Sequence, residues 1–113
     1  MESTRQQKIA RLIQKDLGTI FQQVSREMFS GAMITVTKVY VTKDLSTAKV
    51  YMSLFATNDK ADLMESIKGH TREIRYRLGQ RIKNQLRAVP ELHFFEDNSL
   101  DYIDNIDQLL HDK

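Results

Sequence analysis

Apolar residues recur at helical spacing over the first quarter of the chain. Between Arg5 and Met28 their steps of three, one and four are those of an amphipathic helix with one buried stripe. The stripe contains Ile9, Leu12, Ile13, Leu17, Ile20, Phe21, Val24 and Met28. Ser30 and Gly31 interrupt the pattern directly afterwards, as is typical of a helix end. The spacing therefore predicts one long helix over residues 5–28.

Two runs rich in β-branched and aromatic residues follow this helix. They cover residues 34–41 and 48–55, and the polar sequence KDLST between them is typical of a hairpin loop. In the second run four apolar residues alternate with Lys49, Tyr51, Ser53 and Phe55; they are Ala48, Val50, Met52 and Leu54. The phase slips near Lys38 in the first run, which indicates a β-bulge. The two runs are expected to pair as strands.

The aromatic residues of the predicted strands allow two interpretations. Tyr51 and Phe55 share the face opposite Val50, where they form either a second wall of the core or a platform on which bases stack. Of these, we favour the core. Phe94 and Phe95 are adjacent on a strand and face opposite sides, so one of them is expected in the core.

Helical spacing returns in the middle of the chain. Thr57 and Asn58 are candidate caps for a short helix that reaches Gly69 and carries Leu63, Met64 and Ile67. A further helix is predicted over residues 72–87, with Thr71 as its cap. Its apolar residues are four apart: Ile74, Leu78, Ile82 and Leu86. Two consecutive helices are therefore expected, with a break beside Gly69.

A third strand and a last helix complete the pattern. Residues 89–96 read as a strand, whose Pro90 is confined to a strand start or an edge. Asp97, Asn98 and Ser99 cap a final helix with inward-facing Leu100, Ile103, Ile106, Leu109 and Leu110. The order αββααβα predicts an α+β fold with helices packed on one face of a three-stranded sheet. We expect a single domain over residues 1–113, and a monomer.

Positive charge is concentrated on the helix predicted over residues 72–87. Seven basic residues stand against Glu73 alone between positions 68 and 87, although the whole chain carries a net charge of only +2. A helical projection places Arg72, Tyr76, Lys83 and Arg87 on one stripe. Arg77 and Arg81 fall on the opposite flank, and Arg75 falls near the core boundary, where it must snorkel or pair.

This arrangement suggests a polyanion partner. Guanidinium groups match phosphate oxygens and stack on bases, and a tyrosine among them offers a ring to an unpaired base. The candidate RNA-binding residues are Arg72, Arg75, Tyr76, Arg77, Arg81, Lys83 and Arg87. Two alternatives stay open: a solvated helix face whose arginines pair with the acidic C-terminal end, and a module that holds an acidic protein partner.

Other function classes find little support in the sequence. The chain has no cysteine, so thiolate metal sites and cysteine nucleophiles are excluded. Its three histidines show no metal-ligand spacing, and no nucleophile–base pair stands out, so we expect no enzyme, no metal and no cofactor. No leader or membrane span is evident, and a cytoplasmic protein is expected.

Several segments of the chain resemble the ribosome-binding factor A family of bacterial assembly factors. The resemblance rests on ITVTKVYVTKDLSTAKVYMS at the hairpin, on LGQRI and LRAVPELHFFEDNS, and on NIDQLL near the end. These segments follow one another in the family's order over almost the whole chain.

The resemblance implies a KH-like fold, of the type in which a helix and a hairpin precede the helix pair. It also implies binding to the small ribosomal subunit and its precursor RNA, and assistance in maturing the ends of that RNA. The GxxG loop of ordinary KH domains is absent here. The family has an Ala-x-Gly kink in its place, and His70, Thr71 and Arg72 occupy that position in this chain.

Overall fold

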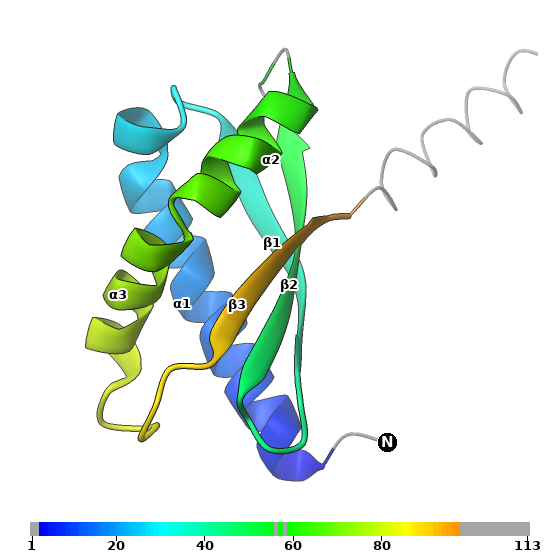
Figure 1. The fold of residues 1–113 in the computed structure, drawn as a ribbon, viewed down its shortest axis with the longest axis vertical. Coiled ribbons are helices and arrows are strands. Elements are labelled where there is room, and N and C mark those ends of the chain that lie inside the picture. The colour runs from blue at the N-terminus through cyan, green and yellow to red at the C-terminus, as the bar shows by residue number, and fades with distance from the viewer. Residues whose placement is uncertain (1–2, 56, 58, 98–113) are drawn as a thin grey trace, which may run out of the picture.

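In the described part of the chain, three helices lie on one side of a three-stranded sheet (Figure 1). The computed structural model describes residues 3–55, 57 and 59–97. Its elements are α1 (Thr4–Met28), β1 (Met33–Val41), β2 (Thr47–Phe55), α2 (Lys60–Gly69), α3 (Thr71–Ile82) and β3 (Glu91–Glu96). The order αββααβ confirms the predicted arrangement up to β3. The helix predicted after the third strand lies outside the described residues.

The sheet has the order β1-β2-β3, and its two pairings run in opposite senses. β1 and β2 form an antiparallel hairpin whose register shifts between Val36 and Lys38, which confirms the predicted bulge. β3 pairs parallel to β2, so the chain must cross from one end of the sheet to the other between them. α2 and α3 make this crossing. At the bulge, the Gln14 side chain donates to the carbonyl oxygen of Val36 at 3.2 Å and so ties α1 to β1.

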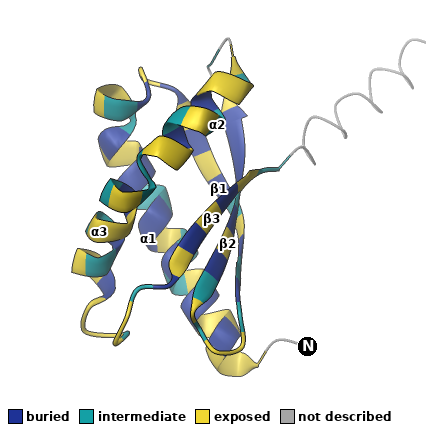
Figure 2. Ribbon diagram, in the orientation of Figure 1, coloured by how far each residue is buried: buried dark blue, intermediate teal, exposed yellow. Residues whose placement is uncertain are grey.

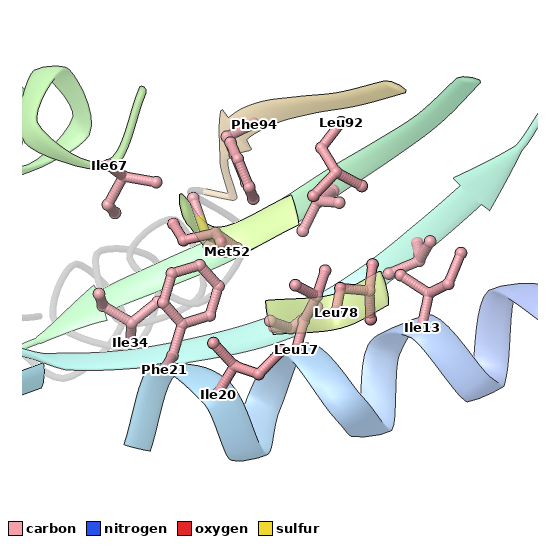
Figure 3. Packing of buried hydrophobic residues seen from close by; sticks show 14 of the residues in the cluster. Ile13, Leu17, Ile20, Phe21, Ile34, Met52, Ile67, Leu78, Leu92 and Phe94 are labelled. Atoms are coloured by element: carbon pink, nitrogen blue, oxygen red, sulfur yellow. The ribbon is translucent and has the colours of Figure 1, made fainter. Parts of the chain in front are cut away.

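The core lies between α1 and the inner face of the sheet. Ile13, Leu17 and Phe21 of α1 are almost completely buried, as are Met52 of β2 and Leu78 of α3. Their side chains meet in one layer beneath the strands (Figure 3). Exposed residues follow the outward surfaces of the helices and alternate with buried residues along much of the strands (Figure 2). The predicted buried stripe of the first helix is therefore confirmed, apart from Leu12 and Met28, which are only partly buried.

The prediction that Tyr51 and Phe55 lie in the core is wrong, because both lie on the outer face of the sheet. Phe55 is 39% exposed and Tyr51 is half-buried, so neither belongs to the main core. All described helices pack on the opposite face, and the strand alternation alone does not show which faces are covered. Phe94 and Phe95 divide as predicted, since Phe94 is buried and Phe95 is 41% exposed.

The helix predicted over residues 72–87 is shorter than expected. α3 ends at Ile82, whose carbonyl oxygen accepts from the amides of Gln85 and Leu86 in a closing turn. The chain needs the following residues to return to β3, which begins at Glu91 and not at residue 89 as predicted. Pro90 precedes the strand, and having no amide hydrogen it cannot donate to the sheet.

The break between α2 and α3 lies at His70, whose side chain contacts the end of α2. Gly69 lies inside α2, and His70 alone separates the two helices. The His70 Nδ1 atom lies 2.8 Å from the carbonyl oxygen of Ser66, and its ring meets the Phe29 ring edge-on at 5.5 Å. Thr71 does not cap α3 as predicted, because its hydroxyl donates backward to the carbonyl oxygen of Lys68 at 2.7 Å. The kink therefore needs neither GxxG nor Ala-x-Gly.

The first prediction concerns the packing of α3 on the core. Leu78 is completely buried, so Leu78→Ala should lower the free energy of unfolding by about 2 to 5 kcal/mol through the cavity it leaves. Urea unfolding followed by circular dichroism measures this loss. Gln80→Ala, at an exposed position of the same helix, is the control and should change stability by less than about 0.5 kcal/mol. Equal effects of the two substitutions would contradict the assignment of the core face.

Candidate nucleic-acid interface

Arg75 fixes the loop that follows α3. Its guanidinium group donates to the carbonyl oxygens of Val89 at 2.6 Å and Pro90 at 3.1 Å. The prediction that this residue must pair is thus confirmed, with backbone carbonyls as the partners. These contacts hold the chain against α3 just before β3 begins, and they occupy much of the donor capacity of the guanidinium group.

Two further arginines of α3 are paired with carboxylates. The Nε atom of Arg77 lies 3.0 Å from Glu73, one turn earlier on the same helix. The Nε atom of Arg81 lies 3.1 Å from Asp16 of α1, whose side chain is only 10% exposed. Arg81 therefore joins α3 to α1 and satisfies a carboxylate that would otherwise be buried without a counter-charge. Because both arginines are paired, neither is freely available to a phosphate.

The remaining predicted residues are exposed, but they do not form one helical stripe. Arg72 and Tyr76 lie one turn apart on α3, and Tyr76 is 63% exposed. Lys83 follows the last residue of α3, and Arg87 lies in the loop beyond it. The common helical face predicted for these residues is therefore wrong, because the helix ends five residues earlier than expected. Among the described residues no ion pair involves Arg72, Lys83 or Arg87.

A hollow of about 710 Å³ lies between α3 and the loop that Arg75 holds. It is lined by Thr71, Arg72, Arg75, Tyr76, Gly79, Gln80 and Val89, and we call it the α3 hollow. None of these lining residues is acidic. Gly79 allows the close approach of the loop, because a Cβ atom there would stand 3.0 Å from a methyl group of Val89. The hollow thus depends on the same contacts that end α3.

Sequence analysis missed part of this lining. Gln80 and Val89 were not among the candidate residues, although Gln80 stands one turn after Tyr76 on the same side of α3. Gln80 carries an amide that can donate to and accept from a base edge. Its spacing from Tyr76 was available in the sequence, whereas the approach of Val89 depends on the path of the loop.

The α3 hollow has the chemistry of a site for single-stranded nucleic acid. An exposed ring, an amide and the unpaired Arg72 lie within one concave surface, which suits a stacked base with a phosphate nearby. Within the described part of the chain, no cluster of three or more His, Asp and Glu side chains is arranged to hold a metal ion.

None of the helices between residues 3 and 97 combines the length and the apolar character required to cross a membrane.

Comparisons with known proteins give a consistent result. The family model described as ribosome-binding factor A matches residues 5–110. The chain is 44% identical to ribosome-binding factor A of Cytophaga hutchinsonii over 110 residues, which cover 97% of this chain and 83% of the relative. It is 49% identical to that of Flavobacterium johnsoniae over 111 residues, covering 97% and 85%.

Solved structures show the same fold. The solution structure of a putative ribosome-binding factor A from Thermotoga maritima superposes with a TM-score of 0.68 at 24% identity, covering 88% of this chain and 92% of that one. A homology model of Thermus thermophilus ribosome-binding factor A, fitted into the cryo-EM map of a 30S complex with that factor, gives a TM-score of 0.63 at 22% identity, covering 79% and 91%.

The second prediction separates the two paired arginines. Arg81→Met leaves the buried Asp16 carboxylate without its partner and should lower the free energy of unfolding by about 1 to 3 kcal/mol. Arg77→Met removes the same charge from an exposed pair and should cost less than about 0.5 kcal/mol. Urea unfolding of both variants makes the comparison. Adding Asp16→Asn to Arg81→Met should restore part of the stability, and equal losses in the two single variants would contradict the structural role of Arg81.

Proposed function

Because the chain belongs to the ribosome-binding factor A family, we propose that it binds the small ribosomal subunit and its precursor RNA. In this proposal it acts in the cytoplasm as an assembly factor that assists late maturation of the small-subunit RNA. It does so by binding and not by catalysis. The observation that carries the proposal is the family match over residues 5–110, in a chain that also presents an acid-free hollow beside unpaired cations.

The α3 hollow supports RNA as the ligand. Tyr76 offers a ring face to a base, while Arg72 at the edge of the same hollow can meet the adjoining phosphate. Lys83 and Arg87 extend the positive surface along the loop, and Lys68 extends it toward α2. Arg75 keeps the walls of the hollow in place through the loop carbonyls. The ligand therefore meets a surface that is already formed, which limits the entropy lost on binding.

The third prediction tests the free cations. Reversing Arg72, Lys83 and Arg87 to Glu should abolish cosedimentation with purified small subunits, because phosphate contacts dominate such affinity. The thermal midpoint should stay within about a few degrees of the parent, since these side chains are exposed. The matched control reverses Lys8, Arg11 and Lys15, three exposed residues of α1, and changes the net charge equally. If only the α1 variant loses binding, the RNA contact lies on α1.

Salt dependence distinguishes RNA from an acidic protein partner. Four cations of this region, Lys68, Arg72, Lys83 and Arg87, remain outside ion pairs within the described residues. If all four meet phosphates, log affinity should fall against log salt with a slope of about −3 for single-stranded RNA.

Crosslinking the protein to precursor subunits and sequencing the attached RNA tests the maturation role. Crosslinks confined to proteins, or cosedimentation with large subunits alone, would contradict the proposal.

The fourth prediction separates stacking from charge. Tyr76→Ala should weaken RNA binding by about 1 to 3 kcal/mol while the salt slope stays unchanged, because the ring meets a base and not a phosphate. Titrations at several salt concentrations give both quantities. Arg72→Gln should instead flatten the slope by about 0.7. A flatter slope for the tyrosine variant would show that its loss reflects displaced cations and not a lost stack.

A further inference from the structure

The outer face of the sheet carries rings and cations side by side. Cross-strand partners point to the same face of a sheet, and Tyr51 points away from the buried Val50. The register thus places two neighbouring rows on the outer face: Lys38, Tyr51 and Phe95, and then Tyr40, Lys49 and His93. We call these six residues the outer-face cluster. The described helices all pack on the other side of the sheet (Figure 1).

Two of the rings of the outer-face cluster already stack on each other. Tyr51 and Phe95 stack with their centroids 5.3 Å apart and their planes inclined by 26°. Phe95 is 41% exposed although it is one of the larger apolar side chains of the chain. Nearly parallel rings with one exposed member can receive a further planar group by stacking.

The cations of the cluster are available to an anion. Lys38 lies opposite Tyr51 across the β1–β2 pairing, and Lys49 lies two residues before Tyr51 on β2. Both lysines are exposed, and neither makes an ion pair within residues 3–97 as far as the structure describes them. Glu91 borders the cluster, and its carboxylate lies 3.5 Å from the Nε2 atom of His93.

The chain itself bounds the cluster on one side. Asp97, which follows β3, reaches over β2 to β1. Its amide donates to the carbonyl oxygen of Met52 on β2, and its carboxylate accepts from the Thr37 hydroxyl on β1 at 2.6 Å. Met33 and Phe55 also face outward, but they pair with each other beyond this crossing. They provide a comparison surface that is apolar, exposed and separate from the two lysines.

A hollow at the edge of β3 connects the cluster with the α3 hollow. It measures about 340 Å³ and is lined by Lys68, Thr71, Leu92, His93, Phe94 and Phe95. Thr71 also lines the α3 hollow, whereas His93 and Phe95 belong to the outer-face cluster. Because the two hollows share Thr71, they offer a route from α3 around the edge of β3 to the outer face.

We propose that the outer-face cluster binds single-stranded RNA, as the continuation of the strand held in the α3 hollow. A base stacks on the Tyr51–Phe95 pair, and the flanking phosphates meet Lys38 and Lys49. This inference rests on the proposed function, because it extends the same RNA beyond the first site. RNA is favoured over an acidic protein segment because ring faces and unpaired lysines occur together and adjoin a surface with the same chemistry.

The test compares two exposed phenylalanines of the outer face. Phe95→Thr removes a ring of the platform, and Phe55→Thr removes an equally exposed ring beyond the Asp97 crossing. Binding of the full chain to a labelled single-stranded RNA of about twelve nucleotides is measured by fluorescence anisotropy. We expect Phe95→Thr to weaken binding by about five- to a hundredfold. Phe55→Thr should leave it unchanged, and both chains should unfold cooperatively at similar temperatures.

A charge variant keeps the test decisive if Phe95→Thr does not fold. Lys38→Gln combined with Lys49→Gln alters only exposed side chains and should flatten the slope of log affinity on log salt by about 1.4. Unchanged slope and affinity in this variant would overturn the inference. The same holds if the parent chain does not bind the oligonucleotide.

Two further outcomes separate this inference from the proposed function. If the cluster variants bind RNA like the parent while the Arg72, Lys83 and Arg87 reversal releases small subunits, the inference fails and the proposed function stands. If substitutions of Ile103 and Ile106 by Ser shift the ring resonances of Tyr51 and Phe95 in RNA-free protein, the outer face holds the chain's own C-terminal segment. That result would overturn RNA as its occupant.

Discussion

Burial of the apolar stripe of α1 is the constraint on which the other elements depend. Ile13, Leu17 and Phe21 are inaccessible to water only because the inner face of the sheet covers them on one side and α3 on another. Phe21 also meets the rings of Phe29 and Phe94, both at 6.1 Å, so the end of α1 is joined to the third strand. The apolar stripe of α1 is thus in contact with the sheet and with α3, and so with segments from most of the described chain. A single core on one side leaves the other side of the sheet without a described cover.

The same packing divides the basic residues of the central region into two groups. Arg81 meets Asp16 where α3 crosses α1, and Arg75 holds the carbonyl oxygens of the returning loop. These side chains shape the surface, and their charges are committed to the protein itself. Of the cations outside such contacts, Arg72 lines the hollow, whose walls are held together by the contacts of Arg75. The number of basic residues in the sequence is therefore larger than the number of groups that can bind phosphate. The arginines with structural contacts instead hold the surrounding backbone and neighbouring helices in place.

Sequence patterns predicted the described elements and the bulge because the spacing of apolar residues along a helix or strand reflects which of its neighbouring residues are buried. The end of α3 could not be predicted in this way, since it depends on contacts between Arg75 and residues fourteen and fifteen positions later. Alternation on β2 likewise showed that Tyr51 and Phe55 share a face, but not that this face lacks a helix. Of the candidate site, the basic and aromatic residue types were evident in the sequence. Their division into paired and free side chains required the tertiary contacts.

The parallel pairing of β3 with β2 also determines when, during folding, the proposed binding surface forms. Thr47 pairs with Glu91, so this ladder closes across a long stretch of chain, and contacts of such separation form slowly and late in folding. On the ribosome, the hairpin and α1 emerge first, while the strand that completes the ring stack is among the last described segments to be synthesised. An unfinished chain would lack both the stack and the loop anchored by Arg75. The proposed RNA-binding surface is thereby a property of the completed fold, and a partially made chain does not present it.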